Sequence, residues 1–313
     1  MTELAAGIWR VTFALPLGID HVHCYVLRAE DGSLTVVDTG LGLDDAQARW
    51  QSVLGSLPGR VERIVITHFH PDHVGAARDV ARLTGAPVFQ GALDYEQCVR
   101  VFGDGDASVR FLDYLREHGM PEQEVEDVLE AGRRLRRHVR FAPDPGPLAP
   151  GDRIAGWDVL HLPGHADGHL ALLRDGILVA GDALLATISP NVGLYPDSRP
   201  DPLADYLGSL ERIVELAPAR AFAGHGEPMD DPAGRARELI AHHEERLEHA
   251  HLAIREEPLD AYRVSLALFP DALSPTLRRF ALAETRAHLE RLVADGRAAR
   301  LEGRATVEYA AGG

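Results

Sequence analysis

Three histidines and one aspartate fall within six residues of this chain, at 68–73 (HFHPDH), directly after the apolar run 61–66 (VERIVI). A strand that ends in a turn can direct several side chains to one point. Imidazole nitrogen and carboxylate oxygen are ligands that zinc and iron accept in proteins. The alternative is a solvated polar turn before a helix. So dense a cluster favours metal ligation instead, and its spacing suits two adjacent ions.

Three later segments share one construction, an apolar stretch followed by glycine and a single polar side chain. They end in Gly164-His165, Gly181-Asp182 and Gly224-His225. Glycine permits a tight turn where a side chain would crowd the ligands. Each segment alone is weak evidence, because a glycine followed by aspartate or histidine after a strand is usually an ordinary turn. Together with residues 68–73, the three segments predict one metal site assembled at several strand ends.

The His-x-His-x-Asp-His motif and these later segments resemble the metallo-β-lactamase fold superfamily over roughly residues 5–230. The resemblance implies an α/β fold, an αββα sandwich of two sheets between helices. Its ligand set, carried onto this chain, is His68, His70 and His165 for one metal ion, Asp72, His73 and His225 for the other, and Asp182 as the bridge. It also implies that Asp38 supports the ligands without binding metal, although a turn or helix-start aspartate is the alternative there.

The C-terminal part narrows the resemblance to the lactamase-β-like group, which carries a winged-helix-type tail and is related to glyoxalase II. The similar stretches are 201–210 (DPLADYLGSL), 259–265 (LDAYRVS) and 283–292 (AETRAHLERL). We therefore predict a catalytic domain over residues 1–232 and a C-terminal winged-helix-like domain over 233–313. Members of that group act on thioesters or, in one branch, on RNA, so membership leaves the substrate open.

Periodicity predicts the intervening elements. We expect hairpins over 8–37, helices at 44–58 and 74–85, and a short strand at 86–89. In the tail we expect helices at 233–256, 259–269 and 275–295, and a hairpin wing around Glu302-Gly303. Four histidines of the first tail helix lie among glutamates, so we expect surface positions rather than a second metal site for His242, His243, His249 and His251.

Residues of about 92–142 form a helical insertion between two ligand-bearing segments, because their apolar positions recur at helical spacing. We expect this insertion to lie over the metal rim as a substrate lid, and packing against the tail is the alternative. Its basic run 133–140 (RRLRRHVR) has the composition of a solvated helix face.

Composition restricts the class of protein. The formal net charge is −16, and all 32 basic residues are arginine. This balance disfavours a nucleic-acid partner and removes the lysine with which glyoxalase II enzymes hold glutathione. The two cysteines are too few for a disulfide framework. Without a signal-peptide pattern or a long apolar segment, we expect a cytoplasmic protein that does not enter membranes, with packing or homodimer formation as the role of the tail.

The ligand set predicts a binuclear metal-dependent hydrolase in which a metal-bridging hydroxide cleaves an ester or thioester bond of a small-molecule or carrier-linked acyl substrate. We expect two divalent ions, zinc first, with iron or manganese as alternatives. The predicted catalytic residues are Asp72, Asp182 and Tyr195, the last as a hydroxyl donor to the oxyanion, although a packing tyrosine is the alternative. The alternative function is a metal-dependent endoribonuclease.

Overall fold

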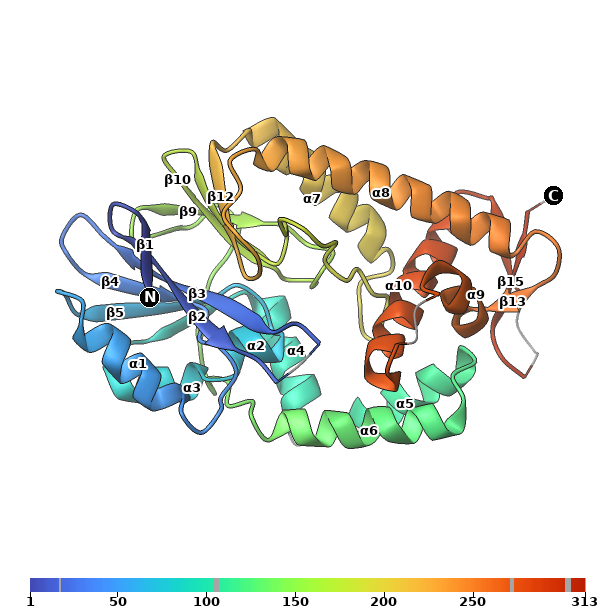
Figure 1. The fold of residues 1–313 in the computed structure, drawn as a ribbon, viewed down its shortest axis with the longest axis horizontal. Helices are drawn as coiled ribbons and strands as arrows, with labels where there is room; N and C mark the ends of the chain where they lie inside the picture. The colour runs from blue at the N-terminus through green and yellow to red at the C-terminus, as the bar shows by residue number, and fades with distance from the viewer. Residues whose placement is uncertain (17, 104–106, 271–272, 302–304, 313) are drawn as a thin grey trace.

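The computed structural model describes residues 1–16, 18–103, 107–270, 273–301 and 305–312. Its first sheet has seven strands in chain order. They are β1 (Thr2–Ala5), β2 (Ile8–Ala14), β3 (His21–Arg28), β4 (Leu34–Val37), β5 (Val61–Ile66), β6 (Val88–Gln90) and β7 (Gly146–Pro147). The pairs from β1 to β4 are antiparallel, and those from β4 to β7 are parallel. Parallel neighbours need crossover connections, which place helices α1 (Ala46–Gly55) and α3 (Ala77–Thr84) on the outer face of this sheet (Figure 1).

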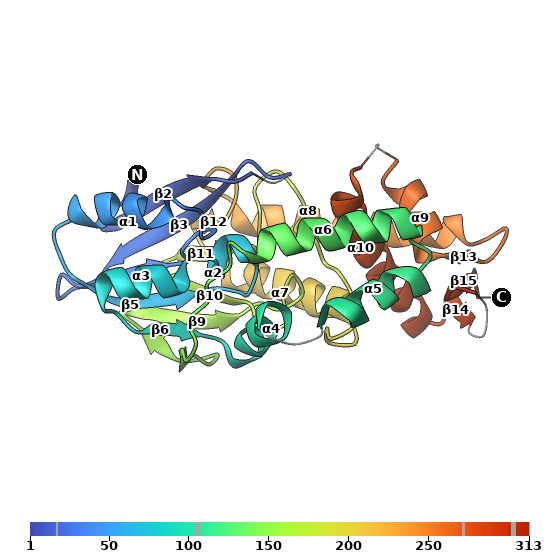
Figure 2. The ribbon, with the colours of Figure 1, turned by 90° about the horizontal axis from the view of Figure 1, so that it is seen from below.

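The second sheet has five strands in the order β12-β11-β10-β9-β8. Their bounds are β8 (Arg153–Ile154), β9 (Trp157–His161), β10 (Leu170–Arg174), β11 (Ile177–Gly181) and β12 (Arg220–Ala223). Helices α7 (Pro202–Leu216) and α8 (Pro232–Ala253) pack on its outer face through Tyr206, Leu210 and Leu239. The two sheets lie face to face between these helix layers (Figures 1 and 2), which confirms the predicted αββα sandwich.

Strands of both sheets are buried on both faces, as sandwiched strands must be. In β3, Tyr25 and Leu27 face the second sheet, whereas Cys24 and Val26 face the helices. This alternation follows from the two-residue period of a strand. Such strands are mostly apolar, although Thr35 in β4 and His23 in β3 are buried polar residues.

All the predicted ligands follow strands whose carboxyl ends meet at one edge. Strands β4 and β5 are parallel, and so are β11 and β12. Strand β9 has the same direction as β11, because both pair antiparallel with β10. The two edges meet where the Tyr25 hydroxyl donates to the carbonyl of Ala223 (2.5 Å) and the amide of His23 donates to Gly224 (2.7 Å). The fold of the sandwich therefore brings the predicted ligands together at one edge.

The insertion forms three helices, α4 (Ala92–Phe102), α5 (Ala107–Glu117) and α6 (Glu122–Arg136). Helices α5 and α6 bury Leu115, Val125 and Val128 against the tail, in one apolar core with Ile254 and Leu289. Packing against the tail, the alternative to a lid, therefore describes these two helices (Figure 2).

The tail begins with α8 and continues through β13 (Leu259–Asp260), α9 (Ala261–Leu268), α10 (Pro275–Ala294), β14 (Ala298–Leu301) and β15 (Glu308–Ala311). Its three strands form a separate sheet in the order β13-β15-β14. The predicted tip of the wing at Glu302-Gly303 lies outside the described residues. The predicted helix at 74–85 is interrupted, because α2 (Pro71–Val74) ends before α3 begins. None of the helices in the described ranges is long and apolar enough to cross a membrane.

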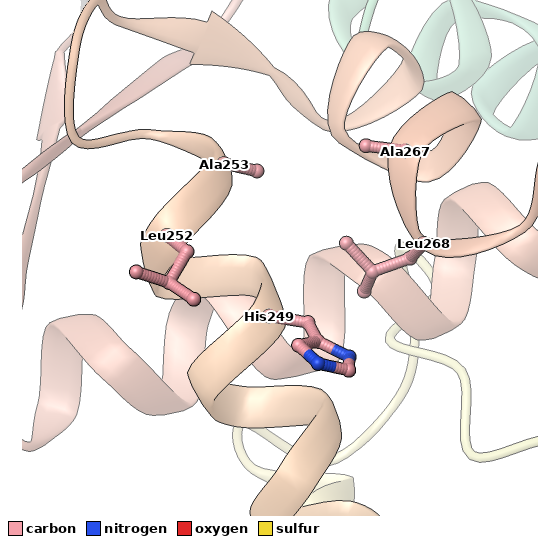
Figure 3. Close-up of a pocket in the computed structure, with 5 residues that line it drawn as sticks. All are labelled: His249, Leu252, Ala253, Ala267 and Leu268. Atoms are coloured by element: carbon pink, nitrogen blue, oxygen red, sulfur yellow. The ribbon is translucent and has the colours of Figure 1, made fainter.

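The surface prediction for the tail-helix histidines is wrong for His243, which is 0% exposed and contacts His288 of α10. Its position completes an apolar face of α8 with Ala236, Leu239 and Ala250. His249 does lie at the surface, beside an open pocket between α8 and α9 (Figure 3). That pocket is lined by His249, Leu252, Ala253, Ala267 and Leu268, which include no carboxylate and so give no metal-binding set.

Candidate metal centre

The first predicted ligands are presented by the end of β5 and by the short helix α2. His68 comes two residues after the end of the buried strand, and Pro71 begins the helix at its first position, where a missing amide hydrogen costs nothing. The amide of His73 donates to the carbonyl of His70 (3.0 Å), so the turn closes on itself. His68 and His73 are both 0% exposed, which places their imidazoles inside the edge of the sandwich rather than on a solvated turn.

His68, His70 and His165 form the first group of converging ligands. One ring nitrogen from each lies within 4.8 Å of the others. His68 Nε2 and His70 Nδ1 face each other at 3.1 Å. Three imidazoles at this separation form a set with which a divalent ion can be coordinated.

Asp72, His73 and His225 form the second group, and Asp182 lies between the two groups. His225 Nε2 is 3.4 Å from Asp72 Oδ2 and 3.2 Å from Asp182 Oδ2. Asp182 Oδ2 is also 3.7 Å from His165 Nε2, and Asp182 Oδ1 is 3.5 Å from His73 Nε2. One carboxylate thus reaches ligands of both groups, as the bridging assignment requires.

The outer nitrogen of each of three imidazoles has a hydrogen-bond acceptor of its own. His165 Nδ1 lies 2.8 Å from the carbonyl of Asn191, His225 Nδ1 lies 2.6 Å from the carbonyl of His21, and His73 Nδ1 lies 2.8 Å from Asp38 Oδ2. A carbonyl or carboxylate can only accept, so Nδ1 carries a hydrogen, and in the neutral ring Nε2 is the nitrogen that keeps a lone pair. The Nε2 atoms, which these acceptors leave free, are the ones that converge in the cluster.

Asp38 connects both groups from behind. Besides holding His73, it accepts from the amide of Thr67 and from the Thr67 hydroxyl, each at 2.8 Å. The Thr67 oxygen is then free to accept from His68 Nδ1 at 3.0 Å. Asp38 is 2% exposed and has a φ of +59°, a conformation that aspartate and asparagine adopt more readily than most residues. Its predicted role stays a prediction, and these contacts are the ones that such a role needs.

The donor set fits divalent cations. Among the described residues, His73 Nε2, His165 Nε2 and Asp182 Oδ1 are buried without a hydrogen-bond partner. Buried polar atoms are rarely left unpaired, and each such atom costs free energy. All three point into the cluster, where a cation would satisfy them together. Two buried carboxylates supply compensating negative charge.

The electrostatics agree with cation binding. Burial and the neighbouring His73 and His70 hold the pKa of His68 well below its ordinary value, so its lone pair stays available. Burial favours the neutral acid at Asp182, but His225 and His73 outweigh it and hold the pKa of that carboxyl well below its usual range. At His73 and His225, burial lowers the pKa but Asp182 outweighs it, and the pKa of His225 rises to about 10, so these two rings hold a proton that a metal ion would displace.

Glycine brings the backbone against the ligands at two of the strand ends. A Cβ on Gly224 would lie 2.2 Å from Asp182 Oδ1 and 2.6 Å from His73 Cε1. A Cβ on Gly181, whose φ is +52°, would lie 2.8 Å from His169 Nε2. The glycines beside the predicted ligands therefore leave room for the ligand side chains.

Three contributing residues were not predicted from the sequence. His169 is buried, stacks on His68, and accepts from the amide of Asp182 at 3.0 Å. Asp94 of α4 accepts from the amides of Phe69 (3.0 Å) and Gly168 (2.8 Å), so it ties two ligand loops together. Asn191 holds His165. The spacing His165-Ala166-Asp167-Gly168-His169 was the available signal for His169, whereas Asp94 and Asn191 had no signal in their own segments.

Tyr195 lies close to the cluster but not in it. Its hydroxyl donates to Asn191 Oδ1 at 3.1 Å, and burial raises its pKa to about 12. It therefore remains protonated at neutral pH. Its role as an oxyanion donor stays a prediction.

Comparisons with known proteins agree with this geometry. Residues 17–225 match the metallo-beta-lactamase superfamily, and residues 247–310 match the metallo-beta-lactamase-like C-terminal domain. The chain belongs to the metallo-β-lactamase superfamily. The family and the ligand cluster together make it a metallo-hydrolase of that superfamily.

Several relatives cover nearly the whole chain. The probable metallo-hydrolase YqjP of Bacillus subtilis is 29% identical over 301 residues, 90% of each chain. A hydroxyacylglutathione hydrolase of Methylobacillus flagellatus is 27% identical, covering 80% of this chain and 81% of the relative. The crystal structure of the metallo-beta-lactamase family protein TTHA1429 from Thermus thermophilus superposes with a TM-score of 0.86 at 37% identity, covering 99% of this chain and 100% of that one.

Proposed function

We propose that this metallo-β-lactamase superfamily protein hydrolyses an ester or thioester bond in a small-molecule or carrier-linked acyl substrate. The observation that carries the proposal is the position of Asp182, whose two oxygens reach imidazoles of both ligand groups. A binuclear centre of this kind hydrolyses activated acyl bonds without an extended binding surface.

The residues have separate tasks in this proposal. His68, His70 and His165 would hold one ion, Asp72, His73 and His225 would hold the other, and Asp182 would reach both. When bound, two divalent ions supply a hydroxide nucleophile at neutral pH and polarise the carbonyl oxygen. Asp38 fixes the His73 ring and, through Thr67, the His68 ring. Tyr195, whose hydroxyl donates to Asn191 Oδ1, is the candidate hydroxyl donor to the oxyanion.

The substrate class has support from a relative and from composition. The relative named hydroxyacylglutathione hydrolase is named for an acylated thiol. Glutathione itself is disfavoured here because the chain has no lysine, and the net charge of −16 disfavours RNA. Zinc is our first candidate metal, with iron or manganese as alternatives.

The domain boundary, the fold of the tail, the cellular location and the oligomeric state are part of the same proposal. We place the boundary between the catalytic and C-terminal domains near residues 232 and 233, at the start of α8. The element order α8-β13-α9-α10-β14-β15 supports a winged-helix-like tail. A cytoplasmic location and a homodimer are the expected context.

One preparation tests the function. The zinc-loaded protein is assayed on a panel of esters and thioesters and on single-stranded RNA, with a chelator control and His70→Ala. We expect thioester turnover to exceed RNA cleavage, and both to disappear with chelator and in the variant. Efficient RNA cleavage that falls steeply with salt, together with inert thioesters, would reverse this ranking. The exposed Arg133, Arg134 and Arg137 of the α6 region would then be the phosphate-binding candidates.

A further inference from the structure

Helix α10 of the tail begins beside the metal centre. A Cβ placed on Gly18 would lie 3.0 Å from Leu277 Cδ2, so the first turn of α10 touches the loop between β2 and β3. That loop leads into His21, whose carbonyl oxygen holds the ligand His225. One side of α10 therefore borders the loop that supports the second ligand group.

The same helix also borders the loop that supports the first ligand group. Asn191 Nδ2 donates to the carbonyl of Phe280 (3.1 Å), and the amide of Leu194 donates to the carbonyl of Ala283 (3.0 Å). The carbonyl of Asn191 in turn accepts from the ligand His165. The start of α10 thus lies between two loops that each hold a metal ligand, at the edge where a substrate must approach.

Arg279 is the cation at this position, and no anionic partner for it lies among the described residues. The structure gives it no ion pair and no hydrogen bond with any described residue. Its guanidinium lies over the ring of Phe280 (3.9 Å) and near that of Phe111 (6.0 Å). Tyr195 is close enough for the two side chains to influence each other's ionisation. Arg279 is therefore surrounded by the rings of Phe111 and Phe280 and by the uncharged phenol of Tyr195.

The other arginines of α10 have partners. Arg278 donates to the carbonyls of Ser265 and Phe269 (both 3.0 Å), and Arg286 donates to the carbonyl of Leu194 (3.3 Å). Arg291 pairs with Asp201 (2.9 Å) and also with Asp295. Arg279 differs from these neighbours although the chain carries 48 acidic residues against 32 basic ones, so carboxylates are not scarce.

Leaving such a charge unpaired is unfavourable. Arg279 is partly buried, and burial lowers its pKa. A guanidinium that has lost part of its hydration gains most from an anion held in a bidentate contact. Cation–π contacts recover a smaller share, about 0.5–2 kcal/mol.

We propose that Arg279 binds an anionic group of the substrate, a carboxylate or phosphate, while the bond to be hydrolysed lies at the metal cluster. This inference rests on the proposed acyl-hydrolase function and adds a specificity-determining residue to it. Phe111 and Phe280 provide apolar walls for the chain that joins the two ends of such a substrate. The anion has two possible sources, a carboxylate on the acyl group or a phosphate on the carrier.

Three probes separate these sources. Butyryl-N-acetylcysteamine is neutral, succinyl-N-acetylcysteamine carries a carboxylate on the acyl side, and butyryl-coenzyme A carries phosphates on the leaving group. Each is assayed with zinc-loaded wild type, Arg279→Gln, Arg279→Lys and the control Arg212→Gln, which removes an exposed arginine of α7. We expect Arg279→Gln to lower kcat/KM, mainly through KM, roughly ten- to a hundred-fold more for one anionic probe than for the neutral probe.

Lysine at position 279 should restore part of that preference, because it keeps the charge but loses the planar fork. The control variant should resemble wild type on all three probes. The affected probe identifies the source of the anion. Equal changes on all probes with a lower Tm would make Arg279 a structural brace over Phe280 and overturn the proposal, as would no change on any probe.

Calorimetric binding keeps this test independent of turnover. If wild type hydrolyses none of the probes, the acyl-hydrolase proposal fails. Titration of coenzyme A and of succinate into the zinc-loaded protein still reports on Arg279. Binding that weakens at least ten-fold in Arg279→Gln but not in Arg212→Gln supports the anion site, and equal binding by the two variants overturns it.

Discussion

The metal cluster and the pair His243–His288 both consist of imidazoles removed from water, yet their neighbours differ. In the cluster, the Asp72 and Asp182 carboxylates lie 3.2–3.8 Å from the rings, and two ligand nitrogens have no hydrogen-bond partner among the described residues. In the pair, His243 Nδ1 lies 3.2 Å from His288 Nε2, and His288 Nδ1 lies 2.8 Å from the carbonyl of Glu284. The pair is closed by its own hydrogen bonds.

This difference in neighbours distinguishes a metal-binding site from a buried apolar core. At the pair, burial lowers the pKa of His243 to about 2 and that of His288 to about 4, so both rings are neutral and serve as hydrogen-bonding core residues. At the cluster, carboxylates attract positive charge to unpaired nitrogens. The density of histidine along a segment therefore says less than the carboxylates that the fold brings beside it.

The substitution with the largest expected effect on the metal cluster is Asp182→Ala. Because Asp182 reaches both ligand groups, its loss should remove at least one of two metal ions per chain and nearly all hydrolytic activity, while the fold remains. Elemental analysis, the ester and thioester assay and circular dichroism check these three outcomes. The matched control is His243→Gln, which should retain two ions. A wild-type protein that holds a single ion in excess zinc or manganese would contradict the bridge.

The corresponding substitution in the His243–His288 pair is His288→Ala. It leaves His243 without its partner and creates a cavity in the tail core, so it should lower the free energy of unfolding by about 3 kcal/mol without changing metal content. Urea unfolding measures the first quantity and elemental analysis the second. His249→Ala on the exposed side of α8 should change stability by less than about 0.5 kcal/mol. Metal loss in step with stability would show that the two histidine groups are coupled.

The cluster could be predicted from sequence because its ligands stand next to local signals. Residues 68–73 are contiguous, and the others each follow a glycine at a strand end. Asp94 lacked such a signal, since an aspartate in the first turn of a helix is ordinary, and its two amide donors come from distant loops. Asn191 is similar, because its contact with His165 is made by a backbone carbonyl that any residue could provide.

The error at His243 has a physical reason. Its neighbours Glu244 and Glu245 are charged, which suggested a polar face. Helical spacing instead places His243 on one side of α8 with Leu239, four residues away, and with Ala236 and Ala250, each seven residues away. The insertion shows the same lesson, since amphipathicity indicated helices with a buried face but not which surface of the chain covers it.

A finer test concerns Asp38, the carboxylate behind the cluster. Asp38→Asn keeps the size and tolerates the φ of +59°, but its amide group cannot accept all three hydrogen bonds from Thr67 and His73. We expect metal affinity to fall roughly 10–100-fold. Competition with a fluorescent chelator measures it. Unchanged affinity would return Asp38 to the role of an ordinary turn residue.

The smallest expected effect sharpens the contrast in charge. Glu284 is 7% exposed, and burial raises its pKa to about 7, whereas the pKa of Asp182 is lowered. A carboxyl whose folded pKa lies above its ordinary value of 4.5 binds more protons in the folded state. Its stabilising contribution is complete below that value and is lost as pH rises through about 7.

Wild type should therefore lose about 2 kcal/mol of stability between about pH 5 and pH 7 relative to Glu284→Gln. Unfolding of both proteins across this range measures the difference, with the exposed Glu244→Gln as control. Parallel pH profiles for wild type and Glu284→Gln would mean that Glu284 is ionised in the fold, and the contrast with the metal cluster would then lie in its unpaired nitrogens alone.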